Sequence, residues 1–260
     1  MLLLLVLNTA ARAQVSIADS SISMGLIDVT YAGMWPGADL ADRFGYTNLL
    51  GADVGYLHKS HWYVLGGFHF MFGENVKQQN QLDELAMLNV WPTDQGGVFY
   101  DYGFVDGNGN VHQPNYFQRG YVVPLRIGKI FPALRMFKGV NENSGPFVEL
   151  GAQFIQHKIR IDFDTEEAPF LSDEMLKGYD RLTNGFGALQ TIGYRLFSNN
   201  RYINLTLALE FSQNFTQNRR SLNYDTNTVE DETRVDLLYG LRVKWSFPLY
   251  RTAPEKYYYY

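Results

Sequence analysis

Apolar and polar residues alternate with a period of two along most of the chain. In Val235–Phe247, every second residue from Val235 is apolar or aromatic, and the residues between them include Asp236, Arg242 and Lys244. Ile203–Phe211 repeats this pattern. Because successive side chains of a β-strand point to opposite faces, the alternation predicts strands with one apolar and one polar face.

Eight segments follow this pattern, and each is long enough for the roughly 9–11 tilted residues that cross a bilayer. They are Met24–Trp35, Leu49–Leu57, Trp62–Gly73, Gly120–Phe131, Phe147–Phe163, Gly185–Phe197, Tyr202–Thr216 and Arg234–Leu249. Short connections, such as Leu57–His61 and Ser198–Arg201, alternate with longer ones, which is typical of outer-membrane barrels. We therefore expect an all-β fold: an eight-stranded antiparallel transmembrane β-barrel with long outer loops and short periplasmic turns.

Three connections carry further expectations. Pro132–Pro146 is longer than a periplasmic turn should be. Within the longest connection, Glu74–Arg119, we expect a short helix at Gln81–Asn89. Tyr100–Asn110 is rich in Gly, Asn and Asp and is expected to form a small hairpin outside the membrane.

The composition of the polar face indicates which way the barrel wall is oriented. That face carries many Gly, Ala and Ser residues and isolated charges, which suit a narrow closed lumen, so the large apolar side chains should face lipid. A soluble lipocalin-like barrel, with its apolar face inside, is the alternative. Aromatic residues near the turn side of the strands favour an interfacial girdle: Tyr56, Trp62, Phe131, Phe147, Tyr194, Tyr202, Trp245 and Phe247.

The predicted lumen contains five acidic and four basic side chains. They are Asp28, Asp53, Glu149, Glu210 and Asp236, with Arg126, Arg195, Arg242 and Lys244. Eight strands leave an interior only just wide enough for side chains, and an unpaired buried ion costs several kcal/mol. We therefore expect a structural charge network that plugs the lumen. A proton or ion path along these groups is the alternative.

The chain begins with MLLLLVLNTAARA, a short apolar run that ends in an A-x-A pattern. Residues 1–13 are therefore expected to be a secretory signal peptide, although no basic residue precedes the apolar run. The barrel would then occupy residues 14–249, and residues 250–260 would form a periplasmic, tyrosine-rich tail. No later segment has 18 consecutive apolar residues, which excludes a helical membrane protein.

Composition excludes several kinds of chemistry. The formal net charge is −5, which argues against a nucleic-acid partner, and the absence of cysteine excludes disulfides and thiolate metal sites. None of the common nucleotide-binding, zinc or nucleophile motifs occurs, so no catalytic residue, metal or cofactor is expected. A hydrolase site from His157, Ser212 and Glu210 is a minor alternative, because their strands are not adjacent. The acidic residues after the fifth strand are expected to form a solvated loop: Asp162, Asp164, Glu166 and Glu167.

Several stretches resemble known outer-membrane proteins. Gly240–Trp245 is similar to the terminal-strand signal that the barrel assembly machinery reads. Gly33–Gly45, Lys177–Gly185 and Phe215–Ser221 resemble an uncharacterised family of small outer-membrane β-barrel proteins of Bacteroidota, and the Ala13-Gln14 junction fits the same family. The resemblance implies the barrel fold and a location in the cell outer membrane, and it implies no activity.

These observations favour a non-enzymatic outer-membrane barrel with a plugged lumen, acting as an accessory or scaffold subunit of a larger envelope assembly. Its expected partners are outer-membrane lipid and proteins of that assembly. The tail would either dock on a partner or lie at the membrane interface through Tyr257, Tyr258, Tyr259 and Tyr260. A narrow channel for ions or small solutes and a lipid A or phospholipid hydrolase at the outer rim are the alternatives.

Overall fold

The computed structural model describes residues 23–83, 85, 87–92, 98–105, 111–134, 136, 141–162, 173–198 and 204–249. The expected signal peptide (1–13) and tyrosine-rich tail (250–260) lie outside the described residues. So do residues 199–203, which include most of the turn expected at Ser198–Arg201.

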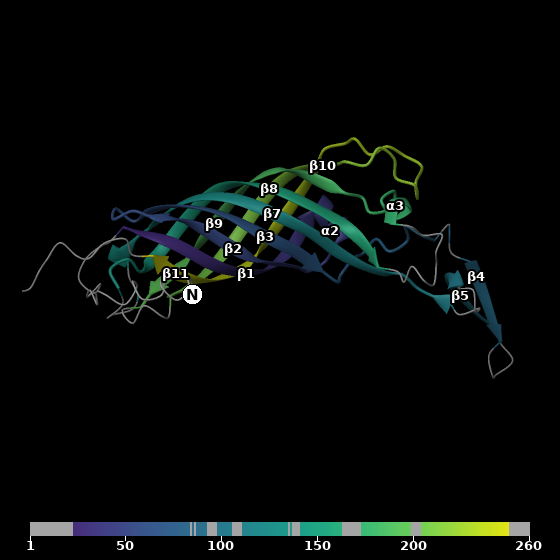
Figure 1. The fold of residues 1–260 in the computed structure, drawn as a ribbon, viewed down its shortest axis with the longest axis horizontal. Coiled ribbons are helices and arrows are strands. Elements are labelled where there is room, and N and C mark those ends of the chain that lie inside the picture. Colours follow the sequence, from purple (N-terminus) through teal and green to yellow (C-terminus); the bar gives the residue numbers. More distant parts are fainter. Residues whose placement is uncertain are drawn as a thin grey trace, which may run out of the picture.

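Eight strands close into one barrel (Figure 1). They are β1 (Met24–Ala38), β2 (Thr47–Leu57), β3 (Trp62–Gly73), β7 (Asn115–Ile130), β8 (Gly145–Asp162), β9 (Thr183–Phe197), β10 (Asn204–Asn218) and β11 (Arg234–Leu249). Their order is β1-β11-β10-β9-β8-β7-β3-β2, every neighbouring pair is antiparallel, and β1 also pairs with β2 to complete the ring. The predicted fold class is confirmed.

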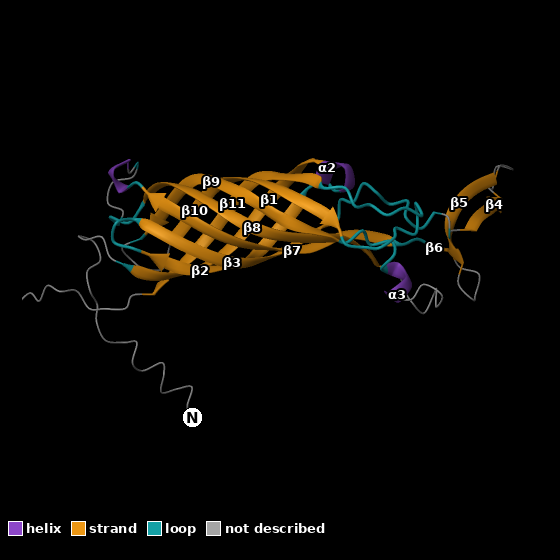
Figure 2. Ribbon diagram, turned by 90° about the horizontal axis from the view of Figure 1, so that it is seen from above, coloured by secondary structure: helices purple, strands orange, loops and turns teal. Residues whose placement is uncertain are grey.

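The barrel has two unlike ends. At the turn end, β2 and β3 are joined through a tight turn at residues 58–61, in which His61 has a positive φ of 66°. At the opposite end, which we call the loop end, longer segments connect the strands (Figure 2). Predicted and observed bounds agree for β3 and β11, whereas most other strands extend further toward the loop end.

The longest connection contains three additional strands, β4 (Met87–Pro92), β5 (Val98–Val105) and β6 (Val111–His112), which form a small sheet beyond the loop end (Figure 1). The pairing of β5 with β6 confirms the hairpin expected in this region. The prediction of a helix at Gln81–Asn89 is wrong, because Met87–Pro92 is a strand that pairs along its length with β5. Hydrogen bonds to a partner strand outweigh local propensity there.

Short helical segments occur in the connections: α2 (Asp39–Arg43), α3 (Asp173–Leu176) and a 3₁₀ turn at Pro132–Leu134. Ala38 has a positive φ of 51°, and after it the chain enters α2, whose Leu40 and Arg43 are buried. The connection between β1 and β2 therefore packs against the core. No helix in the described parts of the chain has the length and apolar character needed to span a membrane.

The two faces of the wall differ sharply in chemistry. On β10, Leu209 is 60% exposed while the next residue, Glu210, is 4% exposed. The same alternation on the other strands places large apolar residues outside, among them Val54, Leu125, Leu150, Ile192, Leu207, Leu241 and Trp245. An apolar exterior around a polar interior is the arrangement of an outer-membrane β-barrel, and it overturns the lipocalin-like alternative.

The height of the apolar exterior can be read from β7. Its outward-facing residues between Arg119 and Lys129 are Tyr121, Val123, Leu125 and Ile127. Arg119 and Lys129 are ten positions apart, so at a rise of about 3.3 Å per residue and a tilt of about 40° they are separated by roughly 25 Å along the barrel axis. That is the height of the apolar band of transmembrane barrels.

The expected aromatic girdle is present in part. Tyr56, Trp62, Phe131, Trp245 and Phe247 are 38–53% exposed near the turn end. Phe147 was assigned wrongly: it is fully buried, because it lies on the same face of β8 as the inward-facing Glu149. Tyr202 lies outside the described residues.

If lipid covers the exterior, then Leu209→Arg should lower the free energy of unfolding by about 2–4 kcal/mol, because a cation near the membrane midplane loses its hydration. Chemical unfolding in phosphatidylcholine vesicles measures this. Gln217→Arg, near the loop end of the same strand, serves as the control and should cost about 1 kcal/mol or less. Equal and small effects at both positions would contradict a lipid-facing wall.

Candidate functional site

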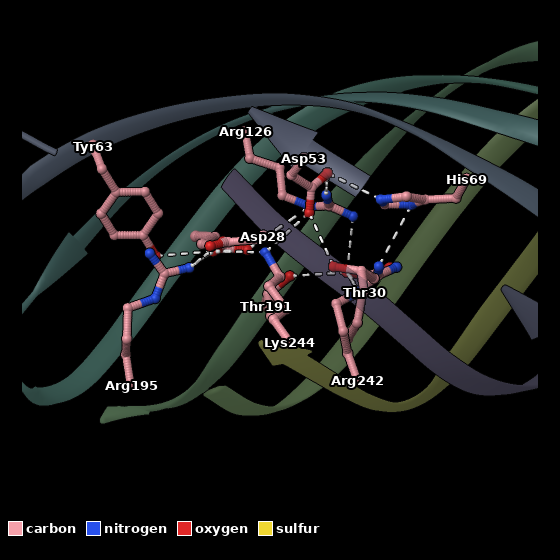
Figure 3. Close-up of polar contacts among 12 residues, drawn as sticks. Asp28, Thr30, Asp53, Tyr63, His69, Arg126, Thr191, Arg195, Arg242 and Lys244 are labelled. Carbon is pink, nitrogen blue, oxygen red and sulfur yellow. Dashed lines mark hydrogen bonds and ion pairs between the residues drawn. The ribbon is translucent and has the colours of Figure 1, made fainter. Parts of the chain in front are cut away.

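Inside the barrel, eight charged side chains from seven strands form one central cluster (Figure 3). Its members are Asp28, Asp53, Glu149 and Glu210 with Arg126, Arg195, Arg242 and Lys244, and all of them are at most 4% exposed. The alternation of each strand turns these residues inward, and the closed sheet brings strands that are distant in sequence around one axis.

Arg126 on β7 links three carboxylates of this cluster. Its Nη1 donates to Asp53 Oδ1 at 3.0 Å, and its Nη2 donates to Glu210 Oε2 at 3.2 Å. Its Nε is 3.8 Å from Glu149 Oε2. One planar guanidinium thus connects β2, β8 and β10 across the lumen, which suits the fixed fork of an arginine better than a lysine.

Glu210 is held mainly by Arg242. The Nε and Nη2 atoms of Arg242 donate to the two Glu210 oxygens at 2.7 and 2.5 Å, a bidentate pair. Arg242 Nη1 also lies 3.5 Å from His69 Nδ1. Since an arginine only donates, Nδ1 is an acceptor, and His69 Nε2 carries the hydrogen that bonds Asp53 Oδ1 at 2.9 Å. This arrangement describes a neutral His69.

Arg195 extends the cluster toward the turn end. Its Nη2 donates to Asp28 Oδ2 at 3.0 Å, and its guanidinium lies 4.9 Å from the Tyr63 ring centroid and 5.7 Å from that of Phe147. The Tyr63 hydroxyl donates to Glu149 Oε1 at 2.9 Å. Aromatic faces therefore cover the side of Arg195 that has no carboxylate, which lowers the cost of burying the cation.

Lys244 completes the charge balance. Its Nζ lies 3.4 Å from Glu149 Oε1 and 3.5 Å from Asp53 Oδ2. With His69 neutral, the four carboxylates of the central cluster face three arginines and one lysine, so the formal charges of the cluster balance. A balanced cluster avoids the penalty of an uncompensated buried ion.

Asp236, the ninth predicted lumen residue, is buried but lies apart from the central cluster. Its Oδ2 bonds His157 Nε2 at 2.9 Å and accepts from Thr216 Oγ1 at 2.6 Å. The Phe44 ring packs edge-on against His157 with 5.6 Å between centroids. Within the described residues, no hydrogen bond or ion pair joins Asp236 to the other eight, so the nine residues form two groups where one was expected.

Inward-facing glycines provide the space that the charges occupy. A Cβ on Gly67 would lie 2.0 Å from Asp53 Oδ1, and a Cβ on Gly128 would lie 2.4 Å from the Tyr63 ring. Both contacts are too short for any side chain to be accommodated without displacement. Glycine at these two positions is therefore a steric requirement of the packed interior around Asp53, Tyr63 and Glu149.

Buried apolar side chains form a cluster on each side of the charges. The turn-end seal consists of Met24, Leu26, Leu57, Tyr63, Leu65, Ile130, Phe147, Phe197 and Ala208, all at most 2% exposed. The loop-end seal is larger and consists of Ala32, Met34, Leu40, Phe44, Leu49, Met71, Val76, Leu82, Tyr116, Val122, Ile155, Ile159, Ile161, Tyr179 and Leu238. The charged belt therefore lies between two apolar layers.

The chain after β1 contributes directly to the loop-end seal. Leu40 and Phe44 are fully buried, and Arg43 Nη1 donates to Thr183 Oγ1 at 2.9 Å. Burial lowers the pKa of Arg43 to about 10, and the nearby cation Arg234 acts in the same direction. Arg43 therefore remains charged at neutral pH. Sequence reasoning missed it because nothing in a loop of mixed composition signals that the segment turns inward.

Ion pairs and hydrogen bonds join the connecting segments at the loop end. Arg181 donates to Gln78 Oε1 at 2.9 Å and also pairs with Asp225, which links two connections that are far apart in sequence. Arg220 donates to both oxygens of Asp180, at 2.7 and 2.5 Å. We call these three residue pairs the loop-end clamp.

The stretches that carry the family resemblance converge at this end. Gly33–Gly45 contains the inward-turning α2, Lys177–Gly185 contains Asp180 and Arg181, and Phe215–Ser221 contains Arg220. Their contacts are long-range in sequence, so the sequence marks the stretches without revealing that they meet.

The structure does not bring His157, Ser212 and Glu210 together as a hydrolase site. His157 is paired with Asp236, whereas Glu210 is paired with Arg242 and Arg126, and His157 and Ser212 are at most 1% exposed. Among the described residues, no group of three or more His, Asp or Glu side chains is arranged to hold a metal ion.

No family model and no curated protein matches the chain. Solved structures similar to it include the attachment invasion locus protein Ail of Yersinia pestis, with 10% identity, 86% of this chain and 99% of the other covered, and a TM-score of 0.38. Neisserial surface protein A has 8% identity, coverage of 85% and 96%, and a TM-score of 0.37. The outer membrane protein OprG of Pseudomonas aeruginosa has 10% identity, coverage of 89% and 98%, and a TM-score of 0.38.

Removing the cation that links three carboxylates should be costly. Arg126→Met is expected to lower the free energy of unfolding by about 3–5 kcal/mol, because it leaves buried carboxylates without compensation. Denaturant titration in detergent micelles measures this. Lys177→Met, which breaks an exposed ion pair with Glu174, is the control and should leave stability nearly unchanged. Indistinguishable midpoints for the two variants would show that the central cluster is not energetically coupled.

The loop-end clamp predicts a local effect for Arg181→Ala. Loss of the contacts with Gln78 and Asp225 should free two connections, so limited proteolysis within residues 74–85 and 219–233 should become faster while the barrel strands stay protected. Mass spectrometry of the fragments identifies the cleavage sites and their rates. Arg160→Ala, whose ion pair is exposed, is the matched control, and cleavage that is equally fast in both variants would argue against the clamp.

Proposed function

We propose that the chain is a non-conducting, non-enzymatic barrel of the cell outer membrane that serves as an accessory or scaffold subunit of a larger envelope assembly. The observation that carries this proposal is the closed interior: a charge-balanced cluster enclosed between two apolar seals. Such an interior leaves the barrel wall and its ends as the surfaces on which the protein can act. The family resemblance within Bacteroidota is part of the same proposal.

The loop end offers the better supported surface for partners. The loop-end clamp fixes the connections before any partner binds, so little conformational entropy is lost on binding. Tyr224 and Val229 are 48% and 61% exposed there, and the Tyr224 ring packs edge-on against Tyr179. Apolar side chains on a fixed backbone are typical of protein interaction surfaces. The tyrosine tail, Tyr257–Tyr260, is the second proposed contact and lies outside the described residues.

Conductance distinguishes this proposal from a narrow channel. The purified full chain, reconstituted in planar bilayers, should give no current steps above those of protein-free bilayers, because ions would have to cross two apolar layers and a neutral ion-pair cluster. Reproducible single-channel steps would reject the sealed barrel and establish the channel alternative.

A pull-down tests the scaffold role. Tagged chain extracted from native envelopes in mild detergent should retain a partner at fixed stoichiometry, and Arg181→Ala should weaken that retention if the clamped loops form the contact surface. A parallel variant without Tyr257–Tyr260 separates the tail from the loops. Absence of a stoichiometric partner for the unaltered chain would remove the scaffold proposal.

A further inference from the structure

The charged residues on the outside of the barrel are not evenly distributed. Among the described residues of the eight barrel strands, outward-facing charges occur only on β7 and β8: Arg119, Lys129, Lys158, Arg160 and Asp162. The outward faces of the other six strands carry apolar, small or amide side chains. Three of the four cations gather at the loop end of this single pair of strands.

These three cations lie next to one another on the wall. Arg119 and Lys158 are direct cross-strand partners, and Arg160 is the diagonal neighbour of Arg119. Like charges directly opposite each other destabilise an antiparallel pair. A local repulsion of this kind on an exposed face is relieved when an anion binds between the cations.

Internal carboxylates neutralise this group only in part. Lys158 Nζ lies 3.4 Å from Asp180, but Arg220 already holds both oxygens of Asp180. Arg160 pairs with Asp162 at 3.3 Å, and both side chains are 54% exposed. For Arg119, the described residues provide a backbone carbonyl, that of Gln118, and the Phe117 ring, and no carboxylate.

Among the described residues, the cations Arg119, Lys158, Arg160 and Arg220 face the carboxylates of Asp162 and Asp180, a local surplus of two positive charges. Glu174 also acts on Arg220, but it is paired with Lys177, so that pair adds no net charge. The whole chain carries a formal net charge of −5, so the surplus is a local feature and does not follow from overall composition. A phosphomonoester, which carries close to two negative charges at neutral pH and three acceptor oxygens, matches this surplus in both charge and hydrogen bonding.

The position of the group indicates where such a phosphate would come from. Toward the membrane centre from these cations, aromatic rings form a row across four strands: Phe68, Tyr121, Phe154 and Phe186. Tyr121 is one outward position from Arg119, and Phe154 is two outward positions from Lys158. Neighbouring centroids in this row are 5.2–6.0 Å apart. A soluble phosphate would not contact these rings, whereas a lipid would place its phosphate on the cations and its acyl chains along the row.

We propose that the loop end of β7 and β8 is a binding site for a membrane lipid with a phosphomonoester headgroup. Arg119, Lys158 and Arg160 bind the phosphate, and the aromatic row contacts the acyl chains. This site lies on the outer wall of the barrel, and lipid binding there does not depend on the proposed scaffold role.

Lipid retention tests the proposal. The purified full chain is exchanged into phosphatidylcholine nanodiscs that contain a small fraction of either phosphatidic acid, a phosphomonoester, or phosphatidylglycerol, a phosphodiester. Lipid bound to the protein after gentle release is then measured by native mass spectrometry. The unaltered chain should retain phosphatidic acid in preference to phosphatidylglycerol and phosphatidylcholine.

Two variants and a matched control locate the site. The triple variant Arg119→Gln, Lys158→Gln, Arg160→Gln should retain phosphatidic acid on the order of 100-fold more weakly, because it removes the three cations that bind the phosphate. The variant Arg119→Lys, Arg160→Lys keeps the charges and should retain most of the binding. The control Lys59→Gln, Lys129→Gln, Lys177→Gln removes equal charge elsewhere and should bind like the unaltered chain. Circular dichroism of each variant verifies that it folds.

Each contrary result overturns the proposal in a distinct way. Equal loss in the triple variant and in the control would show that net charge alone attracts the lipid. Unchanged retention in a folded triple variant would show that these cations do not bind it. Displacement of phosphatidic acid by millimolar inorganic phosphate, with no effect of the aromatic substitution Phe154→Ala, would identify a site for free phosphate instead of lipid.

Discussion

The structure depends on one constraint, namely that an eight-stranded barrel has no room to hydrate the charges it encloses. Each buried ion must therefore find its partner among side chains from other strands. Arg126 meets this requirement for three carboxylates at once, and Arg242 does so for Glu210 with two hydrogen bonds. The ion pairs favour one arrangement of strands across the lumen. The charge cluster therefore both fills the interior and stabilises that arrangement.

The seals follow from the same constraint. Ion pairs are strongest where water is excluded, and clusters of buried apolar side chains lie on both sides of the charged belt. The loop-end seal uses a segment that leaves β1 at Ala38 and turns into the barrel mouth, where Leu40, Arg43 and Phe44 are buried.

The period of two predicted which side chains face lipid, because apolar and polar residues alternate along each strand. Once one residue of a strand is known to face inward, the orientation of every other residue in that strand follows. The inward position of His69 was available from the same alternation, since Phe68 and Phe70 on either side of it face outward. The prediction that Phe147 belongs to the outer aromatic girdle was wrong. Phe147 and Glu149 are two positions apart and therefore lie on the same, inward face of the strand. Contacts made by connecting segments were beyond prediction: Arg43 with Thr183 and Arg181 with Asp225 join residues whose separation in sequence gives no local signal. The separation of Asp236 from the central cluster likewise required the register of the closed sheet.

The central claim is that lipid covers the apolar face while the interior stays dry, and spin-label accessibility along β10 tests it most directly. The chain has no cysteine, so single cysteines introduced at Leu205, Leu207, Leu209, Phe211, Gln213 and Phe215 can be labelled without background. In bilayers, collision with oxygen should exceed collision with a water-soluble nickel chelate at Leu207, Leu209 and Phe211, with the difference shrinking toward both ends of the strand. Chelate collision rates that equal or exceed those of oxygen at Leu207 and Leu209 would contradict the account.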